Sequence, residues 1–254
     1  MWRYTLVAAS LLFCTQLSAD WKRPEYIAQS FYEVALGSEF GGNALKIHKW
    51  VAPIRLFADH RVANETLHNS LLDAHIAHLI KITGMDIQRV SSAQQSNFRF
   101  IFTRESELKS LLKRYSGGAS VKHERGAVCL ASIRTNANAE ITSATVYIPV
   151  DRARMHGKLV ACVVEELTQA LGLPRDSEKV FPSIFNDRTP DDLLTGLDDI
   201  LLRVLYDARI NAGMNQARLK GIVPQIINEL NAKGMIKSAE QRVRQQSGLY
   251  QLLN

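Results

Sequence analysis

The sequence lacks several features that would narrow its class at once. It has no internal repeat and no low-complexity tract, and its apolar run from Leu6 to Phe13 is too short to span a bilayer. These absences argue against a repeat architecture and against a membrane-spanning protein. What remains is an ordinary globular composition over 254 residues, with 46% hydrophobic and 22% charged residues. We expect one domain over residues 20–254.

The first 19 residues have the pattern of a secretory signal peptide. Arg3 precedes the apolar run, and Leu17-Ser18-Ala19 is typical of a cleavage site. Cys14 fits a lipoprotein cleavage box poorly. The sequence therefore predicts a bacterial periplasmic or secreted protein, cleaved near Ala19 and without a transmembrane segment in the mature chain, although an uncleaved anchor is the alternative.

Cysteine is scarce, with three residues in the whole chain. Cleavage would remove Cys14 and leave Cys129 and Cys162, which in an oxidising compartment suggest a disulfide. Such a bridge would join a predicted strand to the helix that carries the main motif. Two buried thiols are the alternative, because sequence spacing does not guarantee bridge geometry.

A dense basic run with interleaved aromatic residues is also missing, so the sequence gives no sign of a specific nucleic-acid partner. Positive charge gathers in residues 214–254, which hold six basic and two acidic residues. We expect a helical, basic extension there. A solvated helical face is favoured over a surface that binds an anionic partner.

Hydrophobic periodicity predicts an α/β (α+β) fold. Strands are expected over 47–57, 98–102, 128–133 and 144–150, and helices over 24–36, 64–83, 105–115, 197–212 and 216–233. The helix over 64–83 is the long one. A further helix should begin between Met155 and Gly157 and end at Gly172-Leu173-Pro174. Pro224 should kink or split the helix in which it lies.

The central motif is Glu165-Glu166-Leu167-Thr168-Gln169-Ala170-Leu171-Gly172-Leu173-Pro174-Arg175-Asp176, which lies on that further helix and the turn after it. Two later segments accompany it. They are Ser183-Ile184-Phe185-Asn186-Asp187 and the run from Leu194 to Tyr206. On a helix, Glu165 and Gln169 share a face, whereas Glu166 points about 100° away.

These three segments, in this order, resemble the metzincin zinc proteases and a group of uncharacterised secreted bacterial proteins that carry the same Glu-Glu-x-x-Gln variant. In the resemblance, Glu165, Gln169 and Arg175 occupy the three zinc-ligand histidine positions. Glu166 matches the general base, and Asp176 comes one position after the third ligand. Ser183, Ile184, Phe185 and Asn186 match the Met-turn, with Phe185 in the methionine position. The implied fold is zincin-like, with a mixed twisted sheet, a long backing helix, a site helix and C-terminal helices.

The metal ligands of that family are absent, so no zinc site is assigned. Oxygen donors from Glu165, Gln169 and Asp176 suit a hard divalent cation better than zinc. An exposed polar stripe of Glu165, Thr168 and Gln169 on an amphipathic helix is the simpler interpretation. His68, His75 and His78 could share a helix face. We expect them to be partly exposed polar positions and not ligands.

Two functions remain open. The first is a non-catalytic metzincin-like protein that binds a peptide, a protein or an envelope polysaccharide in the former active-site cleft, with no cofactor. The second is a metal-dependent, peptidase-like hydrolase in which Glu166 acts as general base beside an oxygen-rich divalent-cation site. Acid/base work on a glycan by Glu166 and Asp176 is a weaker third.

Overall fold

The computed structural model describes residues 21–37, 45–117, 121, 127–188 and 191–253. The predicted signal peptide, residues 1–19, lies outside the described residues. Among the helices that the structure describes, none has both the length and the apolarity needed to cross a bilayer.

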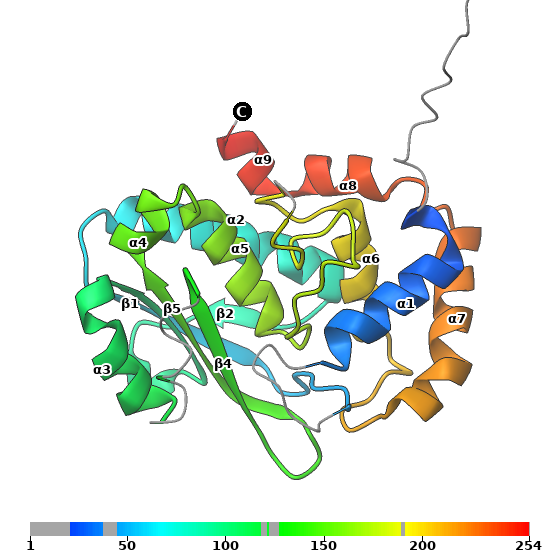
Figure 1. Cartoon of the computed structure of the whole chain (residues 1–254), viewed down its shortest axis with the longest axis horizontal. Helices are drawn as coiled ribbons and strands as arrows, with labels where there is room; N and C mark the ends of the chain where they lie inside the picture. Colours follow the sequence, from blue (N-terminus) through cyan, green and yellow to red (C-terminus); the bar gives the residue numbers. More distant parts are fainter. Residues whose placement is uncertain (1–20, 38–44, 118–120, 122–126, 189–190, 254) are drawn as a thin grey trace, which may run out of the picture.

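A mixed five-stranded sheet lies at the centre of the fold, which is α/β as the sequence predicts (Figure 1). The strand order is β2-β1-β3-β5-β4. The first four strands in this order are parallel, and β4 pairs with β5 in the antiparallel direction. The strands are β1 (Ile54–His60), β2 (Ile87–Arg89), β3 (Phe98–Thr103), β4 (Leu130–Thr135) and β5 (Ile141–Pro149).

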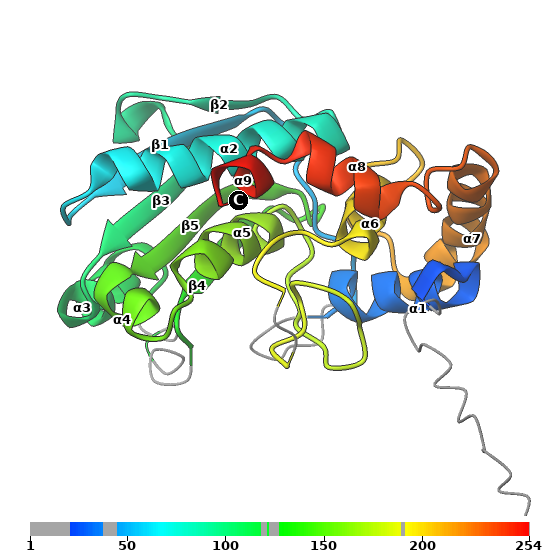
Figure 2. The same cartoon turned by 90° about the horizontal axis from the view of Figure 1, so that it is seen from above.

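Alternating side chains of the strands separate two hydrophobic layers. Phe100 and Phe102 of β3 belong to the main core, whereas Ile101 between them belongs to a smaller cluster on the opposite face. The main core includes buried residues of α2 (Glu65–Thr83) and α5 (Leu159–Gln169). The smaller cluster is completed by α3 (Glu105–Tyr115), so helices cover both faces (Figure 2).

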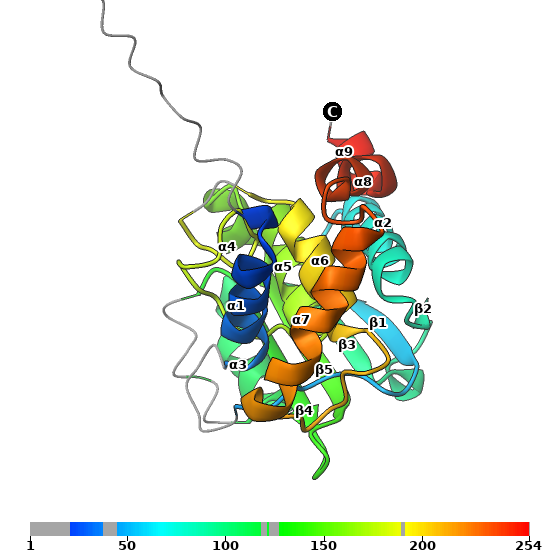
Figure 3. The same cartoon turned by 90° about the vertical axis from the view of Figure 1, so that its right-hand side faces the viewer.

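Helices from both ends of the described chain lie beside and above the sheet. The N-terminal α1 (Pro24–Ala35) packs against α6 (Gly196–Leu205) and α7 (Gln216–Ala232) (Figure 3). The chain then continues through α8 (Ala239–Gln246) and α9 (Gly248–Leu252), which packs against α2. The main core contains residues from Trp21 to Leu249.

Several predicted boundaries are wrong for identifiable reasons. The first strand begins at Ile54 and not at residue 47, directly after Pro53, which has no backbone N–H for a sheet ladder. The predicted site helix is preceded by a separate short helix, α4 (Val150–Met155), and starts at Leu159. Gly157 lies between the two helices with a φ of 68°, a left-handed conformation that ends α4.

The C-terminal region is helical, as expected, but two details differ from the prediction. The helix α7 is not split at Pro224. The side chain of Arg242 is not part of a solvated basic face, because it is largely buried in an ion pair with Asp199 of α6.

Candidate functional site

The C-terminal end of α5 is held by side chains from distant parts of the chain. The indole Nε1 of Trp50 donates a hydrogen bond to the carbonyl of Ala170 at 2.9 Å, and the Tyr206 hydroxyl donates to the carbonyl of Leu171 at 2.8 Å. These bonds satisfy carbonyl groups that a helix end leaves without intrahelical partners. Burial raises the pKa of the Tyr206 hydroxyl, which keeps it a neutral donor.

The chain then turns sharply at Gly172. Its φ is 118°, and a Cβ at this position would lie 2.0 Å from the carbonyl oxygen of His48. Only glycine fits this combination of positive φ and close backbone approach. The turn directs the following segment back along α5, so that Asp176 comes to lie beside Gln169.

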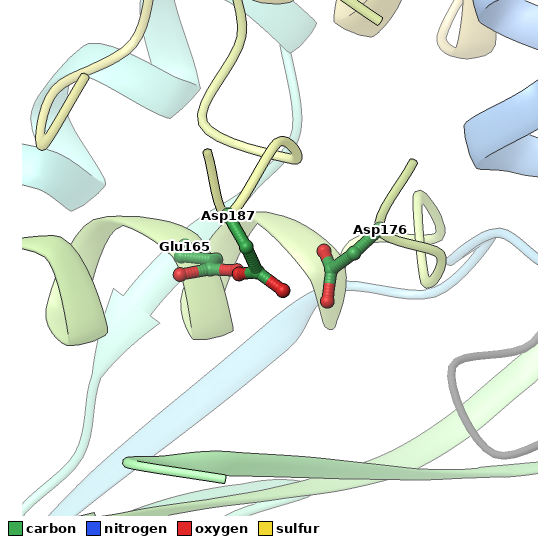
Figure 4. Close-up of side chains that lie close together, drawn as sticks. All are labelled: Glu165, Asp176 and Asp187. Atoms are coloured by element: carbon green, nitrogen blue, oxygen red, sulfur yellow. The ribbon is translucent and has the colours of Figure 1, made fainter. Parts of the chain in front are cut away.

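Three carboxylates from separate segments meet at this place (Figure 4). Glu165 lies on α5, Asp176 follows the Gly172 turn, and Asp187 follows the Ser183–Asn186 segment; one oxygen of each lies within 4.8 Å of the others. Gln169 Nε2 donates a hydrogen bond of 2.7 Å to Oδ1 of Asp176. We call Glu165, Asp176 and Asp187 the carboxylate cluster.

The cluster changes the acidity of Asp176. Burial, followed by the negative charge of Asp187, raises the pKa of Asp176 to about 7, although hydrogen bonds with Gln169 and Glu165 act in the opposite direction. The raised pKa therefore favours a proton on the cluster near neutral pH. A bound cation would compete with that proton for the same oxygens.

The carboxylate cluster lies in a cavity of about 370 Å³ between α5 and the chain that leads into β4. The wall includes Glu166, whose side chain is buried on α5, and the disulfide between Cys129 and Cys162. Cys129 comes directly before β4 and Cys162 lies on α5. The predicted disulfide therefore joins the helix that carries Glu165 to the edge of the sheet.

A buried carboxylate of α6 positions the segment that leads to Asp187. Asp198 accepts hydrogen bonds from the Ser183 hydroxyl at 2.6 Å and from the backbone N–H of Ile184 at 3.2 Å. It also accepts from Thr195, the N-cap residue of α6, with which it forms a capping box. Burial raises the pKa of Asp198 to about 6.

The same segment is fixed from its other side. The Asn186 side chain donates to the carbonyl oxygen of Val180 at 3.0 Å, and its own oxygen accepts from the N–H of Arg188 at 3.0 Å. Phe185, to which the resemblance assigns the methionine position, is fully buried. Asp187 thus extends from a backbone that is anchored before and after it.

Arg175 is directed away from the carboxylate cluster. Its guanidinium forms an ion pair with Glu33 of α1 at 3.6 Å, and its backbone N–H donates to the carbonyl of Val34. Arg175 does not line the cavity, whereas its neighbour Asp176 does. The Arg175 guanidinium therefore does not lie among the three carboxylates.

The structure corrects two expectations about polar residues. Thr168 and Gln169 are buried, so they do not form an exposed stripe with Glu165. His68, His75 and His78 are also buried and not partly exposed. His75 Nε2 lies 3.0 Å from the Thr168 hydroxyl, so this histidine connects α2 to α5.

Asp187 is the residue that sequence reasoning did not assign to the site. It stands directly after the segment that the resemblance assigns to the Met-turn. An acidic side chain immediately after that turn is the signal that points to it. Its proximity to Glu165 depends on the fold of the whole loop.

Fold and site together define an α/β protein with a carboxylate-lined cavity at the edge of a mixed sheet. A family model described as "Protein of unknown function (DUF2927)" matches residues 24–225, and the chain belongs to this family. Searches of curated proteins and of solved structures found no match.

Proposed function

We propose that this protein is an extracytoplasmic, metzincin-like protein that binds a hard divalent cation in the carboxylate cluster and an extended ligand in the adjoining cleft. The observation that carries the proposal is the meeting of Glu165, Asp176 and Asp187 within 4.8 Å at one cavity. Carboxylate oxygens are the donors preferred by Ca²⁺, Mg²⁺ and Mn²⁺, and none of the three supplies the nitrogen or sulfur typical of zinc sites.

The metzincin-like part of the proposal rests on architecture as well as on motifs. A mixed sheet with one antiparallel edge strand, a long helix behind it and a site helix beside that edge agree with the zincin arrangement. The sharp turn at Gly172 brings Asp176 back to the site helix, and in metzincins the third zinc ligand returns to the site helix in the same way. Asp176 then occupies the third-ligand position that the spacing of the motif assigns to Arg175.

The ligand part of the proposal rests on the edge strand. Within the described residues, β4 is paired on one side only, with β5. Such an edge can pair with an extended chain through backbone hydrogen bonds. The cavity adjoins the chain entering β4, so a peptide or another extended envelope component could reach the carboxylate cluster along this edge.

The test is calorimetric titration of protein freed of metal with EDTA, using Ca²⁺, Mn²⁺, Mg²⁺ and Zn²⁺ separately. We expect one site that prefers an oxygen-binding cation over zinc, and a loss of at least about tenfold in affinity for Glu165→Gln and for Asp187→Asn. Glu25→Gln is the matched control, because Glu25 is an exposed acid in the first turn of α1. A wild-type protein that binds none of the four ions below millimolar concentrations would contradict the proposal.

A metal-dependent hydrolase is the second candidate, and the burial of Glu166 in the wall of the same cavity favours it. A cation held by the carboxylate cluster would supply Lewis acidity when bound. Glu166 would then accept a proton from water in the cavity as general base. Loss of peptide hydrolysis by orders of magnitude in Glu166→Gln, with cation affinity unchanged, would support this candidate.

A further inference from the structure

A second cavity lies at the far end of the parallel strands, lined by residues that differ from those of the carboxylate cluster. Its volume is about 370 Å³, and its walls come from the β1–α2 loop, the start of α3 and α4. After β1 the chain passes through α2, on one face of the sheet, to the neighbouring strand β2. After β3 it passes through α3, on the opposite face, toward the strands on the other side of the sheet. In α/β proteins, such a switch point at the carboxyl ends of parallel strands is a common ligand site.

Two arginines line this cavity. Within the described part of the chain, Arg104 and Arg154 are exposed, and neither forms an ion pair or a side-chain hydrogen bond. The cavity also contains Asp151, but Oδ1 of this carboxylate accepts the backbone N–H of Glu105 at 2.8 Å and that of Arg152 at 3.1 Å. Asp151 therefore caps α3, and its carboxylate forms no ion pair with either of the two guanidinium groups.

The N-terminus of α2 faces the same cavity. Asn64, its N-cap residue, has a φ of 73° and makes no side-chain capping bond. The amide groups of the first turn of this 19-residue helix therefore receive no capping bond from that side chain. The positive end of the helix dipole adds to the two arginines.

The neighbouring core adds no negative charge. His68, in the first turns of α2, is fully buried, and neither ring nitrogen has a hydrogen-bond partner. Its ring stacks on Phe102 of β3 with the centroids 4.4 Å apart. Burial above all, and then the neighbouring His60 and Arg154, lower the pKa of His68 to about 4, so the ring remains neutral.

We propose that this cavity binds a small phosphate group, either inorganic phosphate or a phosphate monoester, through Arg104, Arg154 and the N-terminus of α2. Guanidinium groups bind phosphate oxygens by paired, charge-assisted hydrogen bonds, and a helix N-terminus supplies backbone donors. This site is independent of the carboxylate cluster and of the function proposed for it.

The experiment is calorimetric titration with sodium phosphate and with a sugar phosphate, at constant ionic strength and with EDTA present to remove cations from the carboxylate cluster. We expect one site in the wild type and a loss of at least about tenfold in affinity for Arg104→Gln and for Arg154→Gln. Arg218→Gln, an exposed arginine on α7, should bind as the wild type does. Tighter binding of the ester would identify an organic phosphate, and equal binding would identify the inorganic ion.

Three outcomes would overturn the proposal. They are the absence of saturable binding at about 10 mM phosphate, unchanged affinity in both arginine variants, and an equal loss in Arg218→Gln. A second readout places the ligand: the imidazole resonances of His68 should shift on addition of phosphate in the wild type and remain in place in Arg154→Gln. Asp187→Asn should keep full phosphate affinity. The test of phosphate binding is therefore independent of whether the carboxylate cluster binds a cation.

Discussion

Gln169 donates a hydrogen bond of 2.7 Å to Asp176, seven residues further along the chain and beyond the turn at Gly172. This bond joins the last residue of α5 to the first acidic residue of the returning segment. Gln169 therefore holds Asp176 beside Glu165 and Asp187, and the Asp176 carboxyl in turn receives its raised pKa from burial and from Asp187.

The raised pKa of Asp176 makes cation affinity depend on pH. Below pH 7 the carboxyl carries a proton that a cation must displace, whereas above pH 7 it is ionised. We expect the affinity for Ca²⁺ or Mn²⁺ to rise between pH 6 and pH 8 and proton release to accompany binding. Calorimetry in two buffers of different ionisation enthalpy measures that release. Asp176→Asn should bind more weakly and lose most of the pH dependence, and an unchanged profile in this variant would count against the assignment.

The same shift predicts how metal-free stability varies with pH. Asp176 has a higher pKa in the folded protein than its ordinary 3.8, so the folded state binds the proton more tightly than the unfolded state does. Its contribution to stability is complete below pH 4 and is lost as the pH rises through about 7. The free energy of unfolding of Asp176→Asn, relative to that of wild type, should therefore rise between pH 5 and pH 8 by about 2 to 4 kcal/mol. Urea unfolding in EDTA at both pH values measures this, with Glu25→Gln as the control.

Much of the fold was predictable because it depends on local patterns. The predicted helix over 105–115 agrees with α3, and Gly84 ends the long helix α2 with a φ of 69°, as expected of a C-terminal glycine. The predicted ends of helices and strands are wrong where a tertiary contact or a special backbone conformation determines the end of the element. The break at Gly157, which separates α4 from α5, is one example.

The candidate site was predictable only in part. Glu165 and Gln169 share a helix face by spacing alone, but the choice between Arg175 and Asp176 depends on where the chain points after Gly172. Glu33 of α1 draws Arg175 outward, and this long-range ion pair has no signature in the motif. The burial of His75 likewise depends on the position of Thr168 on another helix.

Loss of the disulfide should destabilise the protein and weaken the site together. Cys129 and Cys162 are 33 residues apart and join the start of β4 to α5. Cys129→Ser with Cys162→Ser should lower the free energy of unfolding by about 2 to 5 kcal/mol. Chemical denaturation measures this change, and thiol titration of denatured, unreduced wild type should find no reactive group in the mature chain. Two reactive thiols in that titration would contradict the bridge.

Asp198 should affect cation binding without contacting the cation. Asp198→Asn replaces one of the two carboxylate oxygens with an NH2 group. Either the Ser183 hydroxyl or the N–H groups of Ile184 and Thr195 then lose their acceptor, which loosens the segment that carries Asp187. We expect a stability loss of about 1 to 3 kcal/mol and a cation affinity at least severalfold lower. Ser183→Ala, which removes one of these bonds, should have a smaller effect on both. Equal cation affinity in folded Asp198→Asn and wild type would show that this network does not position Asp187.

A zinc site should be created by three histidines only if the third replaces Asp176. The Gln169 to Asp176 hydrogen bond places Asp176 beside the helix, whereas Arg175 is held by Glu33 on α1. Glu165→His, Gln169→His and Asp176→His together should therefore create a three-nitrogen site with zinc–nitrogen distances of about 2.0 to 2.1 Å. The matched control carries Arg175→His together with Asp176→Ala, so that the Asp176 carboxylate cannot serve as the third ligand. Calorimetric zinc titration should find tight binding in the first triple variant and at least about a hundredfold weaker binding in the control, because two histidines bind zinc poorly without the third. Affinity below that of natural zinc sites is expected, since partners that orient the new imidazoles are missing. If the control binds zinc as tightly as the first variant, the chain after Gly172 can present either residue, and the assignment of Asp176 to the third ligand position fails.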